Sequence, residues 1–564
     1  MKSPESLHAY RAAGVISRGD IAAATLLVEM ACRDGAPEPE PVAWLGLCLA
    51  LRTVRDGHTC VDFDDIEAWA GKSDSETKDA PPWPTDAAAW TGPLEKAAAL
   101  VGKPGDRRPF ILDGHRLYLA RAHAEEASIA AAIDDRAAHG TIRILLGGPG
   151  TGKTTKVAQD LVELFHDSEQ RDVEPSVALA APTGKAAARM AEAIQKACSS
   201  EAVKASREVV DRILQLKPTT VHKLLGSNPG RGDRYRYHAG ERLPFKLVIV
   251  DEASMLSSSL LHHLLAAVAD DATIMLVGDP DQLASVDAGT ALGDIALFGR
   301  AEHAGTPLHG HIRTLTEFHR AESPEILELA HAIREGQPDQ ALGILTAGHK
   351  AVAWVDPDEK TKFDTLTKEV VEHAMELRSL ARGSDAKAVL DKQVALQVLC
   401  AHREGLMSVA GWNRRIEKQL DIGPGFPWYT GRPVMVTRNS PSLRLANGDV
   451  GVVMAGGDTR VAVFGIFDAA KQPLQLPVSR LEDIDTVHAL TIHKSQGSEY
   501  GHAVVVLPER ASRIVTKELL YTAVTRARKR VTVVGSREVI EAAIATPIRR
   551  ATGLASRLGG GRAR

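Results

Sequence analysis

The stretch RILLGGPGTGKTTK, Arg143 to Lys156, carries the pattern that decides the fold of this chain. An apolar run leads directly into a turn rich in glycine, and a lysine and two threonines follow. Such a turn is either a plain connection between a strand and a helix or a loop whose backbone amides surround a phosphate group. Residues 147–154 match the complete pattern G-x-x-x-x-G-K-[ST], between an apolar run and a segment of helical spacing. The sequence therefore favours the phosphate loop.

The side chains of this loop have distinct expected roles. Backbone amides turn inward around a phosphate, and the dipole of the following helix adds to the attraction. Lys153 is expected to reach the β- and γ-phosphates, and Thr154 to ligate Mg²⁺. The expected nucleotide-binding residues are Gly147, Gly148, Pro149, Gly150, Thr151, Gly152, Lys153, Thr154 and Thr155.

Apolar runs that alternate with helical segments predict the fold class. RILLGG, SVALAAPTG, FKLVIVDEAS and ATIMLVGDP form a first set, and VALQVLCAHRE, ALTIHKSQG, HAVVVLPE and KRVTVVGS form a second set. Strands that alternate with helices indicate α/β domains with parallel, doubly wound sheets. Ligands of such sheets bind at the carboxyl ends of the strands, where the polar endings of these runs fall.

Length, charge and composition limit the remaining possibilities. The 564 residues predict roughly three or four domains, and no apolar run approaches the ~18 residues of a membrane span. The start of the chain lacks the apolar segment of a secretory signal, and five scattered cysteines fit neither a disulfide framework nor a zinc site. The net charge of −4 means that DNA would have to bind in a local basic groove. We therefore expect a cytoplasmic protein without membrane association.

Two regions differ from the α/β pattern. Residues 1 to about 105 are rich in alanine and leucine at helical spacing and carry no catalytic cluster, which indicates a helical packing or docking module. Short β runs separated by turn residues, including Asn447-Gly448, predict a small β-barrel at roughly 430–482. The expected domains are a helical N-terminal domain, 1–108; a first α/β domain, 109–310; a second α/β domain, 311–430 and 483–564; and a β insert, 431–482.

Acidic and polar residues at other strand ends complete a candidate hydrolytic site. Asp251, at the end of an apolar run, can hold the Mg²⁺ shell, and Glu252 can polarise the attacking water. Acidic residues at strand ends can also be ordinary solvated caps, but these follow a complete phosphate loop. Gln282 lies just past another strand, where its amide could sense a γ-phosphate.

Two arginines are candidates for stabilising the transferred phosphoryl group from the second α/β domain. Arg526 begins the basic cluster of YTAVTRARKR, and Arg320 ends TLTEFHR. A guanidinium brought in from another domain stabilises the charge that develops in phosphoryl transfer. Alone, either arginine is more commonly a partner in a surface ion pair.

Seven stretches in chain order closely resemble the motif series of the superfamily 1 DNA helicases: GGPGTGKT, APTGKAAARM, TTVHKLLG, VIVDEAS, GDPDQL, LTIHKSQGSEY and YTAVTRARKRV. LDGHRLYLARAH, LCAHREGLMSVAGWN and GRPVMVTRNSPSLRLANGDVG are most similar to the RecD branch of these helicases. The resemblance implies two RecA-like motor domains, an SH3-like insert, ATP and Mg²⁺ as cofactors, and 5′→3′ movement on single-stranded DNA at duplex ends. It also implies RecB-like and RecC-like partner subunits, one of which would carry any nuclease site.

The resemblance assigns DNA contacts to individual positions. Hydroxyls, amides and cations contact phosphate and sugar without reading sequence. The positions are Thr183, Lys185, Thr220, His222, Lys223, His493, Ser495 and Gln496. The segment RGDRYRYHAGER, residues 231–242, is either a hairpin that faces DNA or a solvated loop.

Some functional alternatives stay open. Helicases of the RecD branch usually carry a glutamine upstream of the phosphate loop that recognises adenine, and EEASIAAAIDDRAAHGTIR offers none, so the resemblance assigns no residue to nucleotide selectivity here. The chain could act as a stand-alone translocase, but its N-terminal module lacks obvious helix-hairpin-helix elements, which favours docking onto partner chains. A non-catalytic clamp is disfavoured by the intact Lys153, Asp251, Glu252, Gln282 and Arg526.

Overall fold

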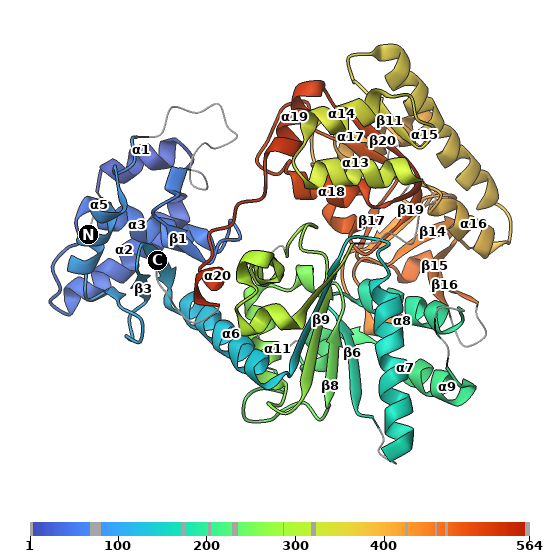
Figure 1. Ribbon diagram of the computed structural model, residues 1–564. Coiled ribbons are helices and arrows are strands. Elements are labelled where there is room, and N and C mark those ends of the chain that lie inside the picture. Colours follow the sequence, from blue (N-terminus) through green and yellow to red (C-terminus); the bar gives the residue numbers. More distant parts are fainter. Residues whose placement is uncertain are drawn as a thin grey trace.

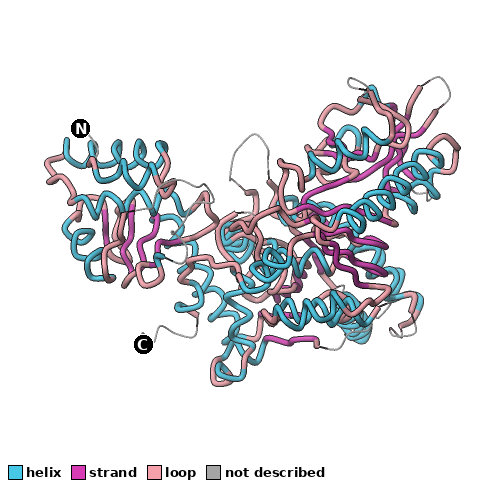
Figure 2. Tube along the Cα trace, turned by 90° about the horizontal axis from the view of Figure 1, so that it is seen from above, coloured by secondary structure: helices cyan, strands magenta, loops and turns pink. Residues whose placement is uncertain are grey.

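Four sheets organise the part of the chain that the computed structural model describes. Two are parallel sheets of α/β domains, one belongs to an N-terminal domain, and one is an antiparallel insert (Figure 1). Figure 2 shows the N-terminal domain as a separate lobe beside the rest of the molecule. The described residues are 4–67, 81–171, 175–200, 203, 205–227, 235–285, 287–316, 323–423, 427–456, 459–467 and 472–558.

The N-terminal domain packs helices against a four-stranded sheet of order β1-β4-β3-β2. Trp44, Trp90 and Phe110 are fully buried in its core. The expectation of a purely helical domain ending at residue 108 is wrong, because β3 and β4 complete its sheet. These strands have four residues or fewer, which is too short to give a clear alternating pattern. The elements are α1 (Ser6–Ala12), α2 (Arg18–Arg33), α3 (Pro41–Thr53), β1 (Cys60–Asp62), α5 (Ala87–Lys96), β2 (Val101–Gly102), β3 (Phe110–Asp113) and β4 (Arg116–Leu119).

The first α/β domain is built on a parallel sheet of order β10-β5-β9-β8-β6-β7. Alternate residues of β5 point to opposite faces: Ile144 and Leu146 join the core under α6 and α11, and Leu145 joins the core under α7 and α8. Helices therefore cover both faces, as the sequence predicts for a doubly wound sheet. The strands are β5 (Ile142–Gly147), β6 (Val177–Ala181), β7 (Thr219–Thr220), β8 (Leu247–Val250), β9 (Thr273–Gly278) and β10 (Ile312–Leu315), and the helices are α6 (Ala120–His139), α7 (Lys153–Arg171), α8 (Gly184–Cys198), α9 (Arg207–Gln215), α10 (Val221–Leu224), α11 (Ser258–Ala267) and α12 (Ala291–Ala296).

The boundary between the α/β domains differs from the expected position at residue 310. Strand β10 pairs in parallel with β5, from Ile312 opposite Ile144 to Leu315 opposite Gly147. The first sheet therefore extends to residue 315. The boundary lies later than expected because β10 is the edge strand of the first sheet, beside the phosphate loop.

The second α/β domain contains a parallel sheet of order β11-β20-β19-β12-β18. One face packs against α13, α14, α18 and α19, and the other packs against α15 and α17. The elements are α13 (Pro324–Arg334), α14 (Pro338–Thr346), β11 (Val352–Val355), α15 (Lys360–Leu380), α16 (Ala386–Gln393), β12 (Leu396–Cys400), α17 (Val409–Gln419), β18 (Ala489–Thr491), β19 (Tyr500–Val506), α18 (Lys517–Val524), β20 (Ala527–Val534) and α19 (Arg537–Ala545).

The insert is an antiparallel sheet of order β16-β15-β14-β13-β17. Its last strand, β17, lies beyond the expected end at residue 482. Asn447-Gly448 does not form a two-residue hairpin but ends the longer connection 437–449, with Gly448 at φ 93°. Closure into an SH3-like barrel stays a prediction. The strands are β13 (Pro433–Val436), β14 (Val450–Met454), β15 (Val461–Phe467), β16 (Pro473–Pro477) and β17 (Ile484–Thr486).

After α19 the chain returns to the other side of the molecule. We call residues 547–558 the C-terminal strap. It ends in α20 (Leu554–Arg557) beside α6, between the N-terminal domain and the first α/β domain (Figure 1). Leu554 and Leu558 are buried with residues of α6 in the core of the first α/β domain. None of the described helices is long and apolar enough to cross a membrane.

Candidate active site

The phosphate loop, residues 148–152, connects β5 to α7. Gly150 and Gly152 have φ angles of 80° and 84°, in the left-handed region that favours glycine. The hydroxyl group of Thr151 donates to the carbonyl of Gly148 at 2.9 Å. A Cβ atom at position 147 would lie 2.5 Å from this hydroxyl oxygen, so a side chain there would collide with it. The glycines of the motif are therefore required by the backbone of the loop.

Lys153 is the first residue of α7, and its ammonium group turns back over the loop. It donates to the carbonyl oxygens of Gly147 and Gly148, the latter at 3.0 Å. An ammonium group carries three donors and can exchange such carbonyls for phosphate oxygens. Its position fits the expected role of neutralising nucleotide phosphates.

The acidic pair follows β8, as predicted. Asp251 accepts a hydrogen bond from the backbone amide of Glu252 at 2.8 Å. Burial raises the pKa of Asp251 to about 6; the carboxylate of Glu252 raises it and the ammonium of Lys153 opposes this. The interaction with Lys153 shows that two motifs far apart in sequence meet in space.

The residues around Asp251 fit a magnesium–nucleotide complex. Burial and the Glu252 carboxylate both disfavour the charged form of Asp251, so a cation bound at Asp251 would stabilise its carboxylate. The Thr154 hydroxyl and the Asp251 carboxylate are oxygen donors, the type that Mg²⁺ prefers. No group of three His, Cys, Asp or Glu in the described part of the chain could hold a metal ion. This set fits Mg²⁺, which usually takes one or two protein ligands together with phosphates.

Gln282 connects the two α/β domains. Its amide nitrogen donates to Asp279 at 3.0 Å, and its amide oxygen accepts from the guanidinium of Arg526 at 3.0 Å. The Tyr521 hydroxyl donates to the same carboxylate oxygen of Asp279 at 3.1 Å. Burial, and secondarily the Asp279 carboxylate, raise the pKa of Tyr521, so this hydroxyl stays protonated. Sequence reasoning missed Asp279 and Tyr521, although both lie within the quoted motifs.

Arg526 is buried, unlike a partner in a surface ion pair. Only 4% of its surface is exposed. Its guanidinium also donates to the carbonyls of Thr522 at 3.0 Å and Ser498 at 3.3 Å. These bonds aim the group at the boundary with the first α/β domain. The second candidate, Arg320, lies outside the described residues.

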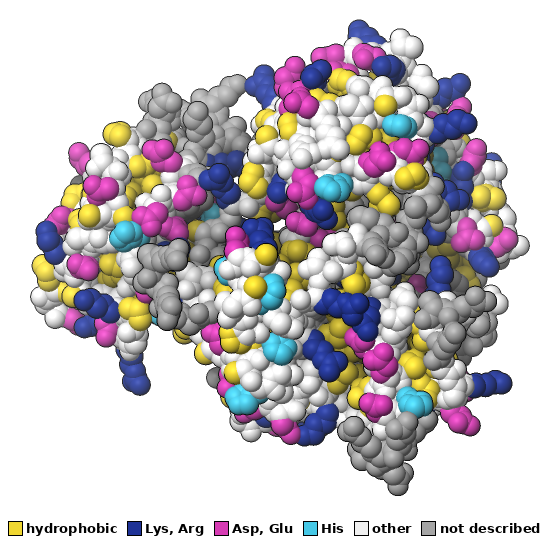
Figure 3. All heavy atoms as spheres, in the orientation of Figure 1, with side chains coloured by type: hydrophobic (Ala, Val, Ile, Leu, Met, Phe, Trp, Pro, Cys, Tyr) yellow, Lys and Arg dark blue, Asp and Glu magenta, His cyan; other side chains and the backbone are white. Residues whose placement is uncertain are grey.

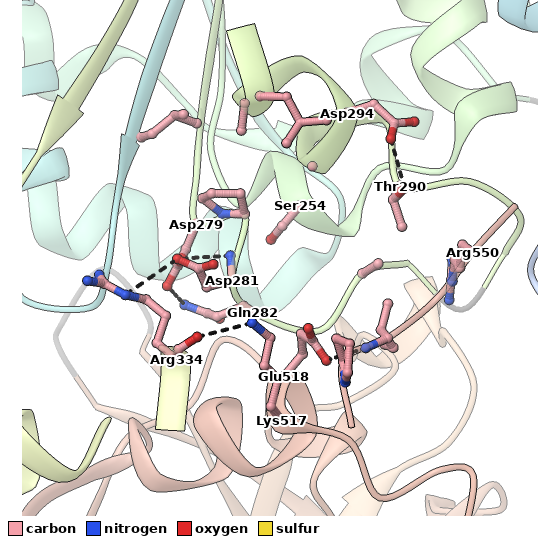
Figure 4. A pocket seen from close by; sticks show the side chains of 18 of the residues that line it. Ser254, Asp279, Asp281, Gln282, Thr290, Asp294, Arg334, Lys517, Glu518 and Arg550 are labelled. Atoms are coloured by element: carbon pink, nitrogen blue, oxygen red, sulfur yellow. Dashed lines mark hydrogen bonds and ion pairs between the residues drawn. The ribbon is translucent and has the colours of Figure 1, made fainter. Parts of the chain in front are cut away.

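A cavity of about 720 Å³ adjoins the phosphate loop (Figure 4). Gly147 and Gly148 line it beside Asp279 and Gln282 of the first α/β domain. Arg334 of α13 and Lys517 and Glu518 of α18 line it from the second α/β domain. The strap and the N-terminal domain supply further walls, which no motif in the sequence indicated. The strap and N-terminal residues are Asp62, Asp65, Pro547, Ile548, Arg549, Arg550, Ala551 and Thr552.

The DNA candidates of the first α/β domain lie at helix starts. Thr183 caps α8 and Thr220 caps α10, each accepting from a backbone amide at 3.2 Å. His222 and Lys223 are exposed. Lys185 is half-buried, and burial, with a smaller effect from Arg189, lowers its pKa to about 8.

The candidates after β18 are less uniform. Ser495 is buried and its hydroxyl donates to the carbonyl of Ile492, so its expected DNA contact does not fit this conformation. The amide nitrogen of Gln496 donates to the carbonyl of Leu283 in the first α/β domain at 3.0 Å. His493 is partly exposed, and burial lowers its pKa.

The basic segment 231–242 is described only from residue 235 onward. The Tyr235 ring lies 4.9 Å from that of His263 and 6.3 Å from that of His222. The face of the molecule drawn in Figure 3 carries Lys and Arg side chains interspersed with Asp and Glu side chains.

Models of known protein families match three parts of the chain. The family described as RecBCD enzyme subunit RecD, N-terminal domain, matches residues 12–118; an AAA domain matches 127–356; and a UvrD-like helicase C-terminal domain matches 486–534. The chain is 39% identical over 557 residues to the RecBCD enzyme subunit RecD of Mycolicibacterium smegmatis, covering 93% of this chain and 95% of that protein.

Two further relatives extend the comparison. The RecBCD enzyme subunit RecD of Mycobacterium tuberculosis is 38% identical over 590 residues, covering 98% of this chain and 96% of that protein. The ATP-dependent RecD2 DNA helicase of Deinococcus radiodurans is 30% identical over 420 residues, covering 73% of this chain and 49% of that protein.

Proposed function

Because the chain belongs to the family of RecD subunits of the RecBCD enzyme, within the superfamily 1 helicases, we propose that it is an ATP-dependent DNA helicase. It moves 5′→3′ along single-stranded DNA from duplex ends. The observation that carries the proposal is the hydrogen bond between Gln282 and Arg526, which joins the two motor domains beside the phosphate loop. A motor needs such a contact, because hydrolysis must change how its two domains meet.

The chain's own residues divide the work of hydrolysis. Lys153 and the loop amides would hold the β- and γ-phosphates, and Thr154 and Asp251 would hold Mg²⁺. Bound Mg²⁺ supplies neutralisation of phosphate charge. Glu252 orients water and accepts its proton, because it follows Asp251 at the end of β8. Arg526 stabilises charge on the transferred phosphoryl group. Gln282 bonds Arg526, so the contact between the motor domains depends on whether a γ-phosphate is bound.

We place the chain in a cytoplasmic complex with RecB-like and RecC-like subunits, which acts at double-strand breaks in recombination repair and degrades linear DNA. The match of residues 12–118 to the RecD N-terminal domain supports this assignment over a stand-alone translocase. The N-terminal domain serves as the docking module. The nuclease activity of the complex is assigned to a partner chain.

The test is reconstitution with the RecB-like and RecC-like chains of the same cell. We expect a heterotrimer whose ATP hydrolysis requires single-stranded DNA. With the other motor inactivated, it should unwind duplexes with a 5′ tail and leave duplexes with a 3′ tail intact. The Lys153→Ala complex is the control. Equal unwinding by the isolated chain without stable association would favour the stand-alone alternative, and no hydrolysis in either state would favour the non-catalytic clamp.

A further inference from the structure

The backbone just after Gln282 is held by the second motor domain. The amide of Leu283 donates to the Thr522 hydroxyl at 2.9 Å, and the carbonyl of Leu283 accepts from the side chain of Gln496 at 3.0 Å. Both partners belong to elements that surround Arg526. The position of Leu283 therefore depends on the second motor domain.

Arg550 of the strap holds the same backbone a few residues further on. Its guanidinium donates to the carbonyls of Ser285 at 2.6 Å, Asp287 at 2.9 Å and Gly289 at 2.8 Å. We call Ser285, Asp287, Ala288 and Gly289 the post-Gln282 loop. Three carbonyls on one planar group fix this loop more tightly than a single ammonium could, because the guanidinium donors have a rigid geometry.

The N-terminal domain reaches the same point. The amide of Gly289 donates to the carbonyl of Gly57 at 3.0 Å. A Cβ atom on Gly57 would lie 3.0 Å from the guanidinium carbon of Arg550. The N-terminal domain, the strap and the post-Gln282 loop therefore meet around one side chain.

The strap itself is anchored close to Arg550. The amide of Ala551 donates to His58 at 2.9 Å, and its carbonyl accepts from the amide of Thr59 at 3.0 Å. The Thr552 hydroxyl donates to Asp294 at 2.9 Å, and the amide of Gly553 donates to the buried carboxylate of Glu126. These bonds give the guanidinium a fixed base in both the N-terminal domain and the first motor domain.

We propose that Arg550 is a positioning residue that holds the post-Gln282 loop, and so couples the N-terminal domain and the strap to the Gln282–Arg526 contact. The proposal rests on the proposed function, since it assumes that the chain hydrolyses ATP. Figure 4 shows Arg550 away from Gln282, at another part of the cavity wall. Arg550 therefore acts on Gln282 through the post-Gln282 loop. Misplacement of a catalytic group by about 1 Å can lower a rate by about a hundredfold.

The test compares Arg550→Ala, Arg550→Lys and the control Arg537→Ala, an exposed arginine on α19 outside the cavity. We expect Arg550→Ala to lower kcat for DNA-stimulated ATP hydrolysis by about tenfold or more, with KM for ATP within about twofold. Arg550→Lys should recover part of kcat, and Arg537→Ala should match the wild type. Hydrogen exchange at the Gly289 amide should be fastest in Arg550→Ala, intermediate in Arg550→Lys and unchanged in Arg537→Ala.

Three results would overturn the positioning role. They are a folded Arg550→Ala protein with wild-type kcat, a raised KM with unchanged kcat, or a lowered kcat with unchanged exchange at Gly289. If Arg550→Ala does not fold, Arg550→Gln keeps a polar side chain but removes the forked guanidinium; it should lower kcat, and an unchanged kcat would reject the proposal. Absence of hydrolysis in the wild type would reject the proposed function instead, and the exchange experiment would still test the contact.

Discussion

The guanidinium of Arg526 lies 3.0 Å from the amide oxygen of Gln282, although 244 residues separate them in the chain. Gln282 follows the central strand β9 of the first motor domain, and Arg526 lies between α18 and β20 of the second. Both side chains are buried, so solvent weakens their interaction little. The contact gives each motor domain a direct connection to the other at the edge of the phosphate loop.

Lys153→Ala should abolish ATP hydrolysis and leave the fold intact. The lysine contacts loop carbonyls, where it would bind phosphates, and it belongs to no hydrophobic core cluster. Steady-state hydrolysis with DNA measures the effect, and circular dichroism and thermal melting exclude unfolding. Lys156→Ala is the matched control, because Lys156 lies on the same helix and pairs with Asp160 at 2.6 Å. Turnover of Lys153→Ala within a few-fold of the wild type would reject the phosphate-loop assignment.

Arg526→Ala should lower turnover by about two orders of magnitude or more and leave nucleotide binding nearly unchanged. We predict the same of Arg320→Ala. The exposed Arg528→Ala is the control for Arg526. Because Arg526 also bonds Gln282, the double variant with Gln282→Ala should be less impaired than the product of the single effects. Weakened ATP binding at normal turnover would show that these arginines only bind nucleotide.

Lys223→Ala should weaken binding of single-stranded DNA for all sequences alike. Lys223 is exposed at the start of α10, where its ammonium can contact a phosphate. Loss of one such contact reduces the slope of log affinity against log salt by about one. Fluorescence anisotropy at several salt concentrations measures this slope. Lys196→Ala, at the exposed end of α8, is the control, and an equal effect of both variants would argue against a specific contact.

Replacing Leu26 and Met30 by aspartate should weaken association with the RecB-like and RecC-like chains by about tenfold or more. These side chains lie one turn apart on α2 and are 59% and 54% exposed, which makes α2 a candidate docking helix. ATP hydrolysis by the isolated chain should not change. Met375→Asp, on α15 of the second motor domain, is the control. Normal assembly of the α2 variant would move the contact to another surface.

Acidification should destabilise the protein between about pH 6.5 and pH 3 through His488. Burial lowers the pKa of His488 to about 3, and the Tyr429 hydroxyl lies 2.8 Å from its ring. The unfolded chain binds a proton near pH 6.5 and the folded chain does not, so the unfolding free energy falls as pH falls, by at most about 1.4 kcal/mol per pH unit. His488→Gln should therefore lose less melting temperature between pH 7.5 and 5.5 than the wild type. The exposed His8→Gln should behave as the wild type does.

The sequence determined those features whose causes are local. The turn at Gly150 and Gly152, and the lysine at the first position of α7, depend on neighbouring residues, so the motif sufficed to predict them. Apolar runs bounded by polar residues likewise predicted parallel sheets, because β5, β6, β8 and β9 are largely buried on both faces. The acidic pair followed, since Asp251 comes at the end of such a run.

The tertiary structure decided features that depend on partners far along the chain. The short strands of the N-terminal domain are held by pairing with each other, as Cys60 with Tyr118, which local periodicity does not encode. The sequence predicted that Ser495 contacts DNA, but its side chain is buried, because its hydroxyl donates to the carbonyl of Ile492 in the same turn. The three carbonyls on Arg550 come from a loop more than 250 residues earlier, at 261, 263 and 265 residues' separation. Only packing of the domains brings such groups together, because hydrogen bonds act over about 3 Å and carry no signature in sequence spacing.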